Sequence, residues 1–285
     1  MQMSDSKSSE YPIPYQWQSS RWVFYLGGFA FGGFGSFLWL QLPNSIANNE
    51  WLRSSFFLFA GLSAWFLGLL GAASIFQAKQ TQVHSSSMKN ADGRTVINAA
   101  LGMRLSQYIF TISTVIGGSI FCLGLWSNTL DLPLSGGQRV FFPLVILIAV
   151  IFSLVDTVRI VVQAPIGNLV LAPDSLSFKQ TFKGKSTVAW RDIVDVAIAS
   201  HKSSKDRCDV LVTFRTDESV TRTVSLDAHW PSIGGAATYW LVRFYFTHPE
   251  LREELSDHRA IDRIRSYRVL DPNEPIVRRM GGDRA

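Results

Sequence analysis

Long apolar runs separated by polar segments dominate the first 164 residues of the chain. Four of these runs are about 19 to 22 residues long and carry almost no charge. Because an α-helix rises about 1.5 Å per residue, each run is long enough to cross a hydrocarbon core about 30 Å thick. We therefore expect residues 22–164 to form an α-helical membrane bundle of four transmembrane helices. The expected spans cover residues 22–42, 55–76, 108–126 and 140–162.

The pattern changes after Pro165, where short segments rich in Val, Thr, Ile and Phe alternate with turn residues. Such segments are typical of antiparallel strands with one buried and one solvent-facing side. We expect six strands, at residues 168–172, 176–182, 186–190, 193–199, 209–215 and 219–226.

A helical pattern follows the strands. Residues 233–246 have the spacing of an amphipathic helix that packs against a sheet. Its expected apolar face carries Ala237, Trp240, Leu241, Phe244 and Tyr245. A second helix is expected from Pro249, because acidic residues come early and arginines late, which complements the helix dipole. The expected parts are a polar tail (1–21), the bundle (22–164), a C-terminal domain (166–247), and a charged helix with a flexible tail (248–285).

The distribution of charge predicts the orientation. The tail before the first span carries Lys7 and Arg21, the link at 78–107 carries four basic residues, and the region after the fourth span is rich in lysine and arginine. The links at 43–54 and 127–139 carry one arginine each. By the positive-inside rule, both termini and the link at 78–107 face the cytoplasm. We expect a multi-pass protein of the cell (plasma) membrane. Residues 165–285 hold 18 of the 27 basic and 16 of the 22 acidic residues, a net charge of +2, which argues against nucleic acid as a partner.

Small residues recur every four positions within the spans. In lipid, such stripes let helix backbones approach closely. The favoured interpretation is packing within the bundle, and the alternative is a homo-oligomer or a contact with a partner's helix. The stripe residues are Gly28 and Gly32 in the first span, and Ala60, Ala64, Gly68 and Ala72 in the second.

Asp156 and Arg159 form the one candidate intramembrane pair of ionisable residues. Charge within a membrane indicates an ion or proton path by default. Both residues lie near the cytosolic end of the fourth span, however, so snorkelling neighbours that pair on one helix face are the favoured interpretation.

The stretch GNLVLAPDSLSFKQTFKGKSTVAWRDIVDVAI resembles the opening of bacterial PH-like domains. Those domains begin with a strand, a turn and a second strand, and then carry a Trp-x-Asp-Ile element, here Trp190, Asp192 and Ile193. Ser175 stands where glycine is usual in the turn. The resemblance covers about residues 166–246 and implies a cytosolic α+β PH-like domain, an antiparallel β-barrel or sandwich capped by a helix. It also implies a non-enzymatic role in assembly or binding, often beside transmembrane helices, and does not imply phosphoinositide binding.

Two basic clusters are candidate contacts with an anionic membrane surface. The alternative interpretation is an ordinary solvated surface. One cluster lies at a predicted hairpin turn and comprises Lys179, Lys183 and Lys185. The other lies on the last predicted helix and comprises Arg263, Arg265 and Arg268.

Motifs with catalytic spacing are missing from the sequence. The five histidines are scattered, the two cysteines lie in different regions, and neither a phosphate-binding loop nor a GxSxG elbow occurs. We therefore expect no catalytic residues, no cofactor and no metal. The leading hypothesis is a membrane-anchored scaffold that binds a protein partner or the inner leaflet. The alternatives are a small transporter or channel formed by the four spans, and a membrane enzyme for which no residue stands out.

Overall fold

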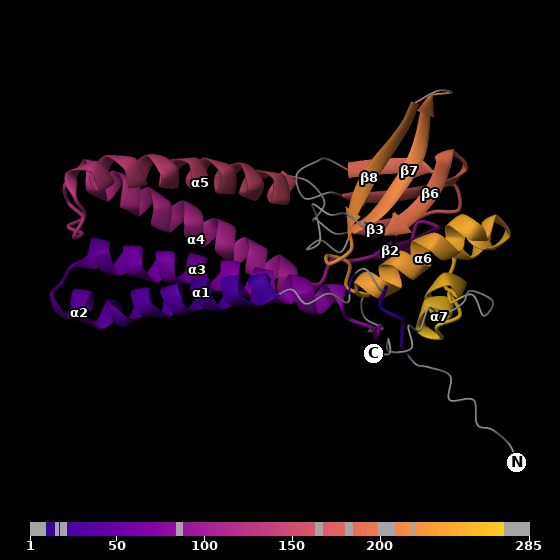
Figure 1. The fold of residues 1–285 in the computed structure, drawn as a ribbon, viewed down its shortest axis with the longest axis horizontal. Helices are drawn as coiled ribbons and strands as arrows, with labels where there is room; N and C mark the ends of the chain where they lie inside the picture. Colours follow the sequence, from indigo (N-terminus) through magenta and orange to yellow (C-terminus); the bar gives the residue numbers. More distant parts are fainter. Residues whose placement is uncertain are drawn as a thin grey trace, which may run out of the picture. The chain divides into compact units, whose positions relative to one another are not determined.

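The computed structural model describes residues 10–14, 17, 22–83, 88–162, 168–179, 185–198, 209–217 and 220–270 (Figure 1). The chain divides into two compact units. A helical unit comprises residues 21–75 and 101–165, and a sheet unit collects the described residues of 1–20, 76–100 and 166–285.

The helical unit contains the apolar runs. Its helices are α1 (Trp22–Leu40), α2 (Leu42–Ala47), α3 (Trp51–Ala78), α4 (Leu101–Trp126) and α5 (Gly136–Val162). The helices α3, α4 and α5 are long and apolar enough to cross a membrane. They begin before the predicted spans, α4 at Leu101 instead of Tyr108, because polar residues at helix ends continue the helix beyond the apolar run.

Close backbone approach joins α1 to α3. A Cβ atom on Gly68 would lie 2.8 Å from the carbonyl oxygen of Gly28, and one on Gly35 would lie 2.8 Å from that of Gly61. Any larger side chain at these positions would push the helices apart. Small residues therefore fix the spacing of this pair, as expected where lipid provides little hydrophobic drive between helices.

The neighbouring pairs α3–α4 and α4–α5 pack in the same way. A Cβ atom on Gly117 would lie 3.1 Å from the backbone nitrogen of Ala60, and one on Gly118 would clash with Cγ2 of Val150. The helices of this unit thus contact one another in the order α1, α3, α4, α5.

The sheet unit contains two antiparallel sheets. The six strands predicted after Pro165 are confirmed, and two further strands come from the link between α3 and α4. One sheet has the order β1-β2-β3-β4-β5 and the other β6-β7-β8. The strands are β1 (Met88–Ala91), β2 (Arg94–Ile97), β3 (Leu169–Leu171), β4 (Ser175–Lys179), β5 (Lys185–Ala189), β6 (Ile193–Ile198), β7 (Asp209–Asp217) and β8 (Val220–Asp227).

Of the two predicted arrangements, a barrel or a sandwich, the closed barrel is not present, because no strand of one sheet pairs with a strand of the other among the described residues. The chain leaves the first sheet through the short 3₁₀ helix η3 (Trp190–Asp192) and enters the second at Ile193. This turn redirects the chain between β5 and β6, which ends the hydrogen-bonded ladder there.

The link between α3 and α4 belongs to the sheet. Asp92 and Gly93, with φ values of 54° and 65°, form the two-residue turn between β1 and β2. Asp-Gly favours this turn because both positions need a positive φ. Strand β2 pairs with β3, which follows α5 in the sequence, so a strand of the link lies directly beside the first strand after the bundle.

One core joins both sheets to the helix α6 (Gly235–Thr247). Ile97 from β2, Leu176 from β4, Val210 from β7 and Leu241 from α6 are fully buried within it. The predicted amphipathic helix is thus confirmed, with Ala237, Phe244 and Tyr245 also buried and Trp240 half-buried.

The prediction of a single second helix from Pro249 is wrong. The chain forms the 3₁₀ helix η4 (Pro249–Ser256) and, after a break, the α-helix α7 (Arg259–Arg265). Asp257 between them is extended, and its carboxylate accepts a hydrogen bond from the Arg259 backbone N–H at 2.8 Å. That bond satisfies a free N–H at the start of α7, which favours a new helix over continuation. The predicted flexible tail from residue 271 lies outside the described residues.

Candidate functional site

Three distant parts of the chain meet within the sheet unit, and we call this place the three-segment junction. It comprises residues 11–14 and 17, residues 77–81, and the C-terminal elements α6 and α7 with the turn before α6. Tyr11 joins all three, since its N–H donates to the Thr81 carbonyl at 3.0 Å and its hydroxyl to the Ile264 carbonyl at 2.7 Å. The Trp240 indole N–H donates to the Pro12 carbonyl at 2.9 Å.

Trp17 is the apolar centre of the junction. Its side chain is fully buried and meets the ring of Tyr239 edge-on, with 6.4 Å between ring centroids. Gly235 lies beneath it, and a Cβ atom there would lie 2.7 Å from the Ala78 carbonyl oxygen and 3.2 Å from the Trp17 ring. The start of α6 therefore packs directly on the end of α3 and on the N-terminal segment.

Hydrogen bonds attach both ends of the link to the turn before α6. The side-chain amide of Gln77 donates to the Pro231 carbonyl at 3.0 Å. At the other end, the backbone N–H of Ser232 donates to the Asn98 carbonyl at 2.9 Å, and the Ser232 hydroxyl donates to the same oxygen at 2.7 Å. The link is thus an integral part of the sheet unit.

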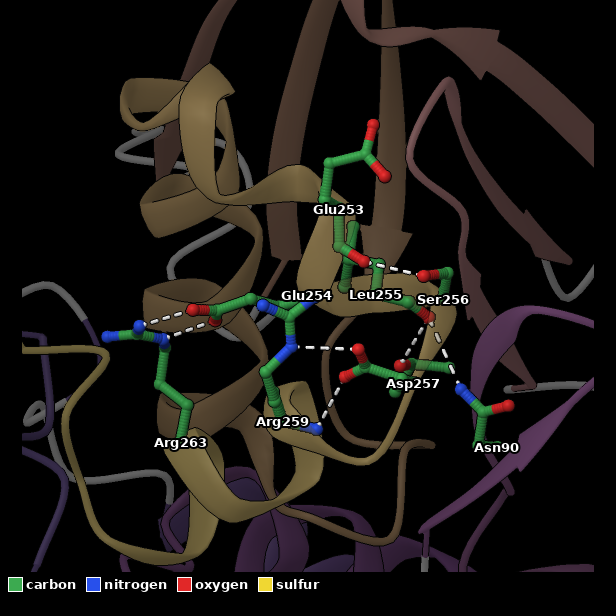
Figure 2. Close-up of polar contacts among 9 residues, drawn as sticks. Asn90, Glu253, Glu254, Leu255, Ser256, Asp257, Arg259 and Arg263 are labelled. Atoms are coloured by element: carbon green, nitrogen blue, oxygen red, sulfur yellow. Dashed lines mark hydrogen bonds and ion pairs between the residues drawn. The ribbon is translucent and has the colours of Figure 1, made fainter.

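An ion pair beside the junction connects η4 to α7 (Figure 2). The Arg263 guanidinium donates to both Glu254 carboxylate oxygens at 2.6 Å, with side chains 22% and 11% exposed. Its Cζ lies 5.1 Å from the centroid of the Phe244 ring. The hydrogen bonds to Glu254 raise the pKa of Arg263 above its usual value. Such a bidentate, largely desolvated pair fixes geometry more than it adds free energy of folding.

The β1–β2 hairpin reaches the same region. The Thr95 hydroxyl donates to the Leu255 carbonyl at 2.9 Å, and the Asn90 side-chain amide lies within 3.5 Å of that oxygen, as Figure 2 shows for Asn90. Thr95 itself is fully buried. The hairpin and η4 are therefore held together by a polar contact inside the unit.

Two tyrosine hydroxyls lie buried near this ion pair. Burial raises the pKa of Tyr11, and burial followed by the nearby Glu254 carboxylate raises that of Tyr245. Both phenols are therefore neutral at physiological pH. The Tyr245 hydroxyl has no hydrogen-bond partner in the part of the chain that the structure describes.

The predicted membrane-surface residues fall into different settings. Lys179 and Lys185 are opposite each other at the end of the β4–β5 hairpin, and Lys183 lies outside the described residues. Arg265 and Arg268 are exposed. Arg263 has a different setting from the predicted one, because its charge is neutralised by Glu254 instead of facing solvent.

The candidate intramembrane pair is also separated. The Asp156 carboxylate accepts a hydrogen bond from the Gln107 side-chain amide of α4 at 2.9 Å. Arg159 is exposed, and no ion pair joins it to Asp156 within the described ranges.

The small-residue stripes face helices of the same chain. Gly28 and Gly32 lie against Gly68, Ala72 lies against Gly28, and Ala60 lies against Gly117. Ala64 is buried.

The sequence-based interpretation did not include the N-terminal segment and the link in the C-terminal domain. The Asp92-Gly93 dipeptide between two short alternating segments is a hairpin signal. Tyr11 and Trp17 carry no comparable signal, because two isolated aromatics in a polar segment have no periodicity.

Across residues 10–270, with the undescribed gaps set aside, no group of three histidine, cysteine, aspartate or glutamate side chains could hold a metal ion. Comparison with protein-family models, with curated proteins and with solved structures gives no match.

Proposed function

We propose that this protein is a membrane-anchored, non-enzymatic scaffold whose sheet unit binds a protein partner at the cytosolic face. The observation that carries the proposal is the construction of the sheet unit from three segments that the apolar helices separate in the sequence. The three segments of this domain share one core, and each connects along the chain to membrane helices. Such a domain is suited to holding a partner at a fixed place on the membrane.

Segments that lie on the same side of a membrane are separated by an even number of crossings, and this supports four spans. Residues 10–14 and 17 share one folded unit with residues 76–83 and 88–100, so these segments lie on the same side of any membrane that the chain crosses. If α3 crosses once, the segment before it must also cross once, and α1 is its apolar helix of 19 residues without a charge. The same reasoning pairs α4 with α5, since residues 100 and 168 both belong to the sheet unit.

The charge distribution supports a cytosolic sheet unit in the plasma membrane. The loops at 43–54 and 127–139 each hold one arginine and one acidic residue, which form the ion pairs Arg53–Glu50 and Arg139–Asp131. Segment 77–107 instead holds four basic residues and one acidic residue. The positive-inside rule places that segment, and the unit to which it belongs, in the cytoplasm.

A PH-like domain is the fold we propose for this unit. Six strands followed by α6 match the layout expected from the resemblance, and the Trp190 indole N–H donates to the Ala172 carbonyl at 2.8 Å, which fixes the β3–β4 turn. Because Glu254 neutralises Arg263, the basic cluster at 263–268 presents less positive charge to lipid than expected. This favours a protein over the inner leaflet as the partner.

Asp156 supports a scaffold over a transporter. A transporter is expected to place ionisable groups near the membrane midplane. Asp156 lies near the end of α5 and is hydrogen-bonded to Gln107. The expected phenotype of Asp156→Asn is therefore unchanged flux and growth.

Site-specific photo-cross-linking in living cells tests the proposal. The probes are Val194 in β6 and Val220 in β8, which are 47% and 45% exposed, and the control is Val158 in α5. We expect a recurring protein adduct from at least one strand position and none from Val158. If all three positions give only lipid adducts or uncross-linked chain, the protein-scaffold proposal is wrong.

A further inference from the structure

The strand β8 forms one edge of the three-stranded sheet (Figure 1). Among the described residues the two sheets have four edge strands, β1, β5, β6 and β8, and β8 is the longest with eight residues. It pairs only with β7 within those residues, so every second residue of β8 directs its backbone N–H and C=O groups away from the ladder. These groups are available to a further strand.

The first half of β8 is the open part of this edge. Val220, Thr221, Arg222 and Thr223 are all exposed, whereas Leu226 near the other end is buried. Side chains alternate between the two faces of a strand, so four consecutive exposed residues show that neither face is covered here. A long, uncovered edge is a template for pairing with another chain.

One face of this half continues the apolar core. The register places Arg222 opposite Phe214 and Val224 opposite Val212, which is fully buried. Val220, Arg222 and Val224 therefore share the face that covers the core. Phe214 and Val224 are half-buried and pack against the core. Apolar residues of an added strand would extend this rim.

The opposite face of the same half is polar. It carries Thr221 and Thr223, and the Thr223 hydroxyl lies 3.0 Å from that of Thr213 on β7. Cross-strand pairs of threonine with threonine and of valine with β-branched or aromatic residues stabilise a sheet. An added strand that fits both faces therefore alternates apolar and hydroxyl-bearing residues.

The charge of Arg222 decides between a second copy of this chain and a different one. Residues 220–224 read Val-Thr-Arg-Thr-Val, which is the same in both directions. An antiparallel second copy that matches valine with valine and threonine with threonine would place two copies of Arg222 opposite each other, which is destabilising. An acidic residue at that place would instead pair with Arg222, which forms no ion pair in the part of the chain that the structure describes.

We propose that residues 220–224 bind an extended segment of the protein partner as an added strand, with an acidic residue of that segment opposite Arg222. Hydroxyl-bearing and then apolar residues flank the acidic residue on both sides. In this mode of recognition, main-chain hydrogen bonds provide affinity and the alternating side chains provide specificity. The inference rests on the proposed function, because it names the kind of segment by which the scaffold holds its partner.

Peptide binding to the full-length protein in detergent tests the site. The probe is a short fluorescein-labelled peptide in which valine and threonine alternate around one glutamate, and a second peptide has lysine in its place. Fluorescence anisotropy gives both affinities. The wild-type protein should bind the glutamate peptide about fivefold more tightly, because one peptide gains a favourable cross-strand charge pair and the other an unfavourable one. A glutamate peptide with proline beside the glutamate should not bind, because proline lacks the backbone N–H and is excluded from paired strands.

Arg222→Glu should reverse the preference, so that the lysine peptide binds more tightly than the glutamate peptide. A gain of binding by the lysine peptide is a result that misfolding does not produce. The matched control is Arg191→Glu in η3, which makes the same change of charge at a side chain that is 88% exposed and should keep the wild-type preference. The inference is overturned if the glutamate peptide does not bind, if the proline peptide binds equally well, or if Arg222→Glu keeps the wild-type preference.

Two further measurements separate the alternatives. A second copy in the matched register would place Thr221 opposite Thr223 of the other copy. An intermolecular disulfide in a Thr221→Cys, Thr223→Cys variant that lacks the native cysteines would therefore identify a second copy as the occupant and overturn the inference. A protein adduct from the photo-cross-linking probe at Val194, together with no peptide binding at β8, would overturn only the β8 site and leave the scaffold proposal in place.

Discussion

Two buried phenols at the junction differ in one respect. The hydroxyl of Tyr11 donates to the Ile264 carbonyl, whereas that of Tyr245 has no partner among the described residues. A buried hydrogen bond contributes about 1 kcal/mol of net stability, whereas a buried hydroxyl without a partner is a cost. The two tyrosines should therefore respond in opposite ways to loss of the hydroxyl.

We predict that Tyr11→Phe lowers the free energy of unfolding by about 1 kcal/mol. Tyr245→Phe should leave it unchanged or raise it slightly, because the substitution removes an unpaired polar group from the core. Urea unfolding of the full-length protein in detergent, followed by tryptophan fluorescence, measures both. Equal destabilisation by the two substitutions would contradict the assigned hydrogen bonding.

The ion pair between Glu254 and Arg263 should contribute far more to the free energy of unfolding than the exposed pair between Asp257 and Arg259. Arg263→Gln leaves a carboxylate with 11% exposure unpaired, and should cost about 2 kcal/mol, less than for a fully buried pair because Arg263 retains some solvent contact. Arg259→Gln breaks the exposed pair with Asp257 and should leave the free energy of unfolding nearly unchanged, because solvent screens both charges. The same unfolding measurement compares them, and similar losses would show that Glu254 finds another partner.

At the scale of elements, strands were predictable where apolar residues alternate over several positions. The strands β3 to β8 fall in this class, and so does α6 with its regular apolar face. The strands β1 and β2 are four residues each, and their burial depends on pairing with β3 far along the chain, which no local pattern encodes.

The break between η4 and α7 could not be predicted from the sequence, for a different reason. The order of charges from Glu250 to Arg268 fits one long helix, but the Asp257 carboxylate accepts the Arg259 N–H at the start of a new one. An aspartate side chain can accept backbone N–H groups in non-helical conformations, which competes with continuation of the helix. The order of charges does not show whether the helix continues or breaks.

The hairpin of β1 and β2 depends on the conformation of Gly93. With φ at 65°, a β-branched residue there is disfavoured by about 1 to 2 kcal/mol, whereas asparagine visits this region readily. We predict that Gly93→Val destabilises the sheet unit by that amount and that Gly93→Asn costs much less. Because no atom lies within 4 Å of a Cβ at Gly93, a clash would not explain the difference. Hydrogen exchange of the backbone amides in β1 and β2 measures the destabilisation by each variant. Equal protection in both variants would contradict the need for a positive φ at Gly93.

At the scale of the whole molecule, the sheet unit is interrupted by two pairs of helices. The chain leaves it after the N-terminal segment and again after the link, and returns each time. On the proposed topology, folding of the sheet unit therefore requires each pair to bring its ends back to the same side of the membrane. Insertion of the helices and assembly of the core constrain each other, which makes the topology testable with few labels.

We predict that an even number of membrane spans separates any two segments of the chain that belong to the sheet unit. In a Cys122→Ser, Cys208→Ser background, single cysteines replace Ala47, Ser135, Lys89 and Glu253, all exposed residues. A membrane-impermeant maleimide should label Ala47→Cys and Ser135→Cys in intact cells, but label Lys89→Cys and Glu253→Cys only after permeabilisation. The first two follow α1 and α4 and should face outward, whereas the last two belong to the sheet unit. Labelling of Ser135→Cys without Ala47→Cys would mean that α1 and α3 do not cross, and would leave two spans instead of four.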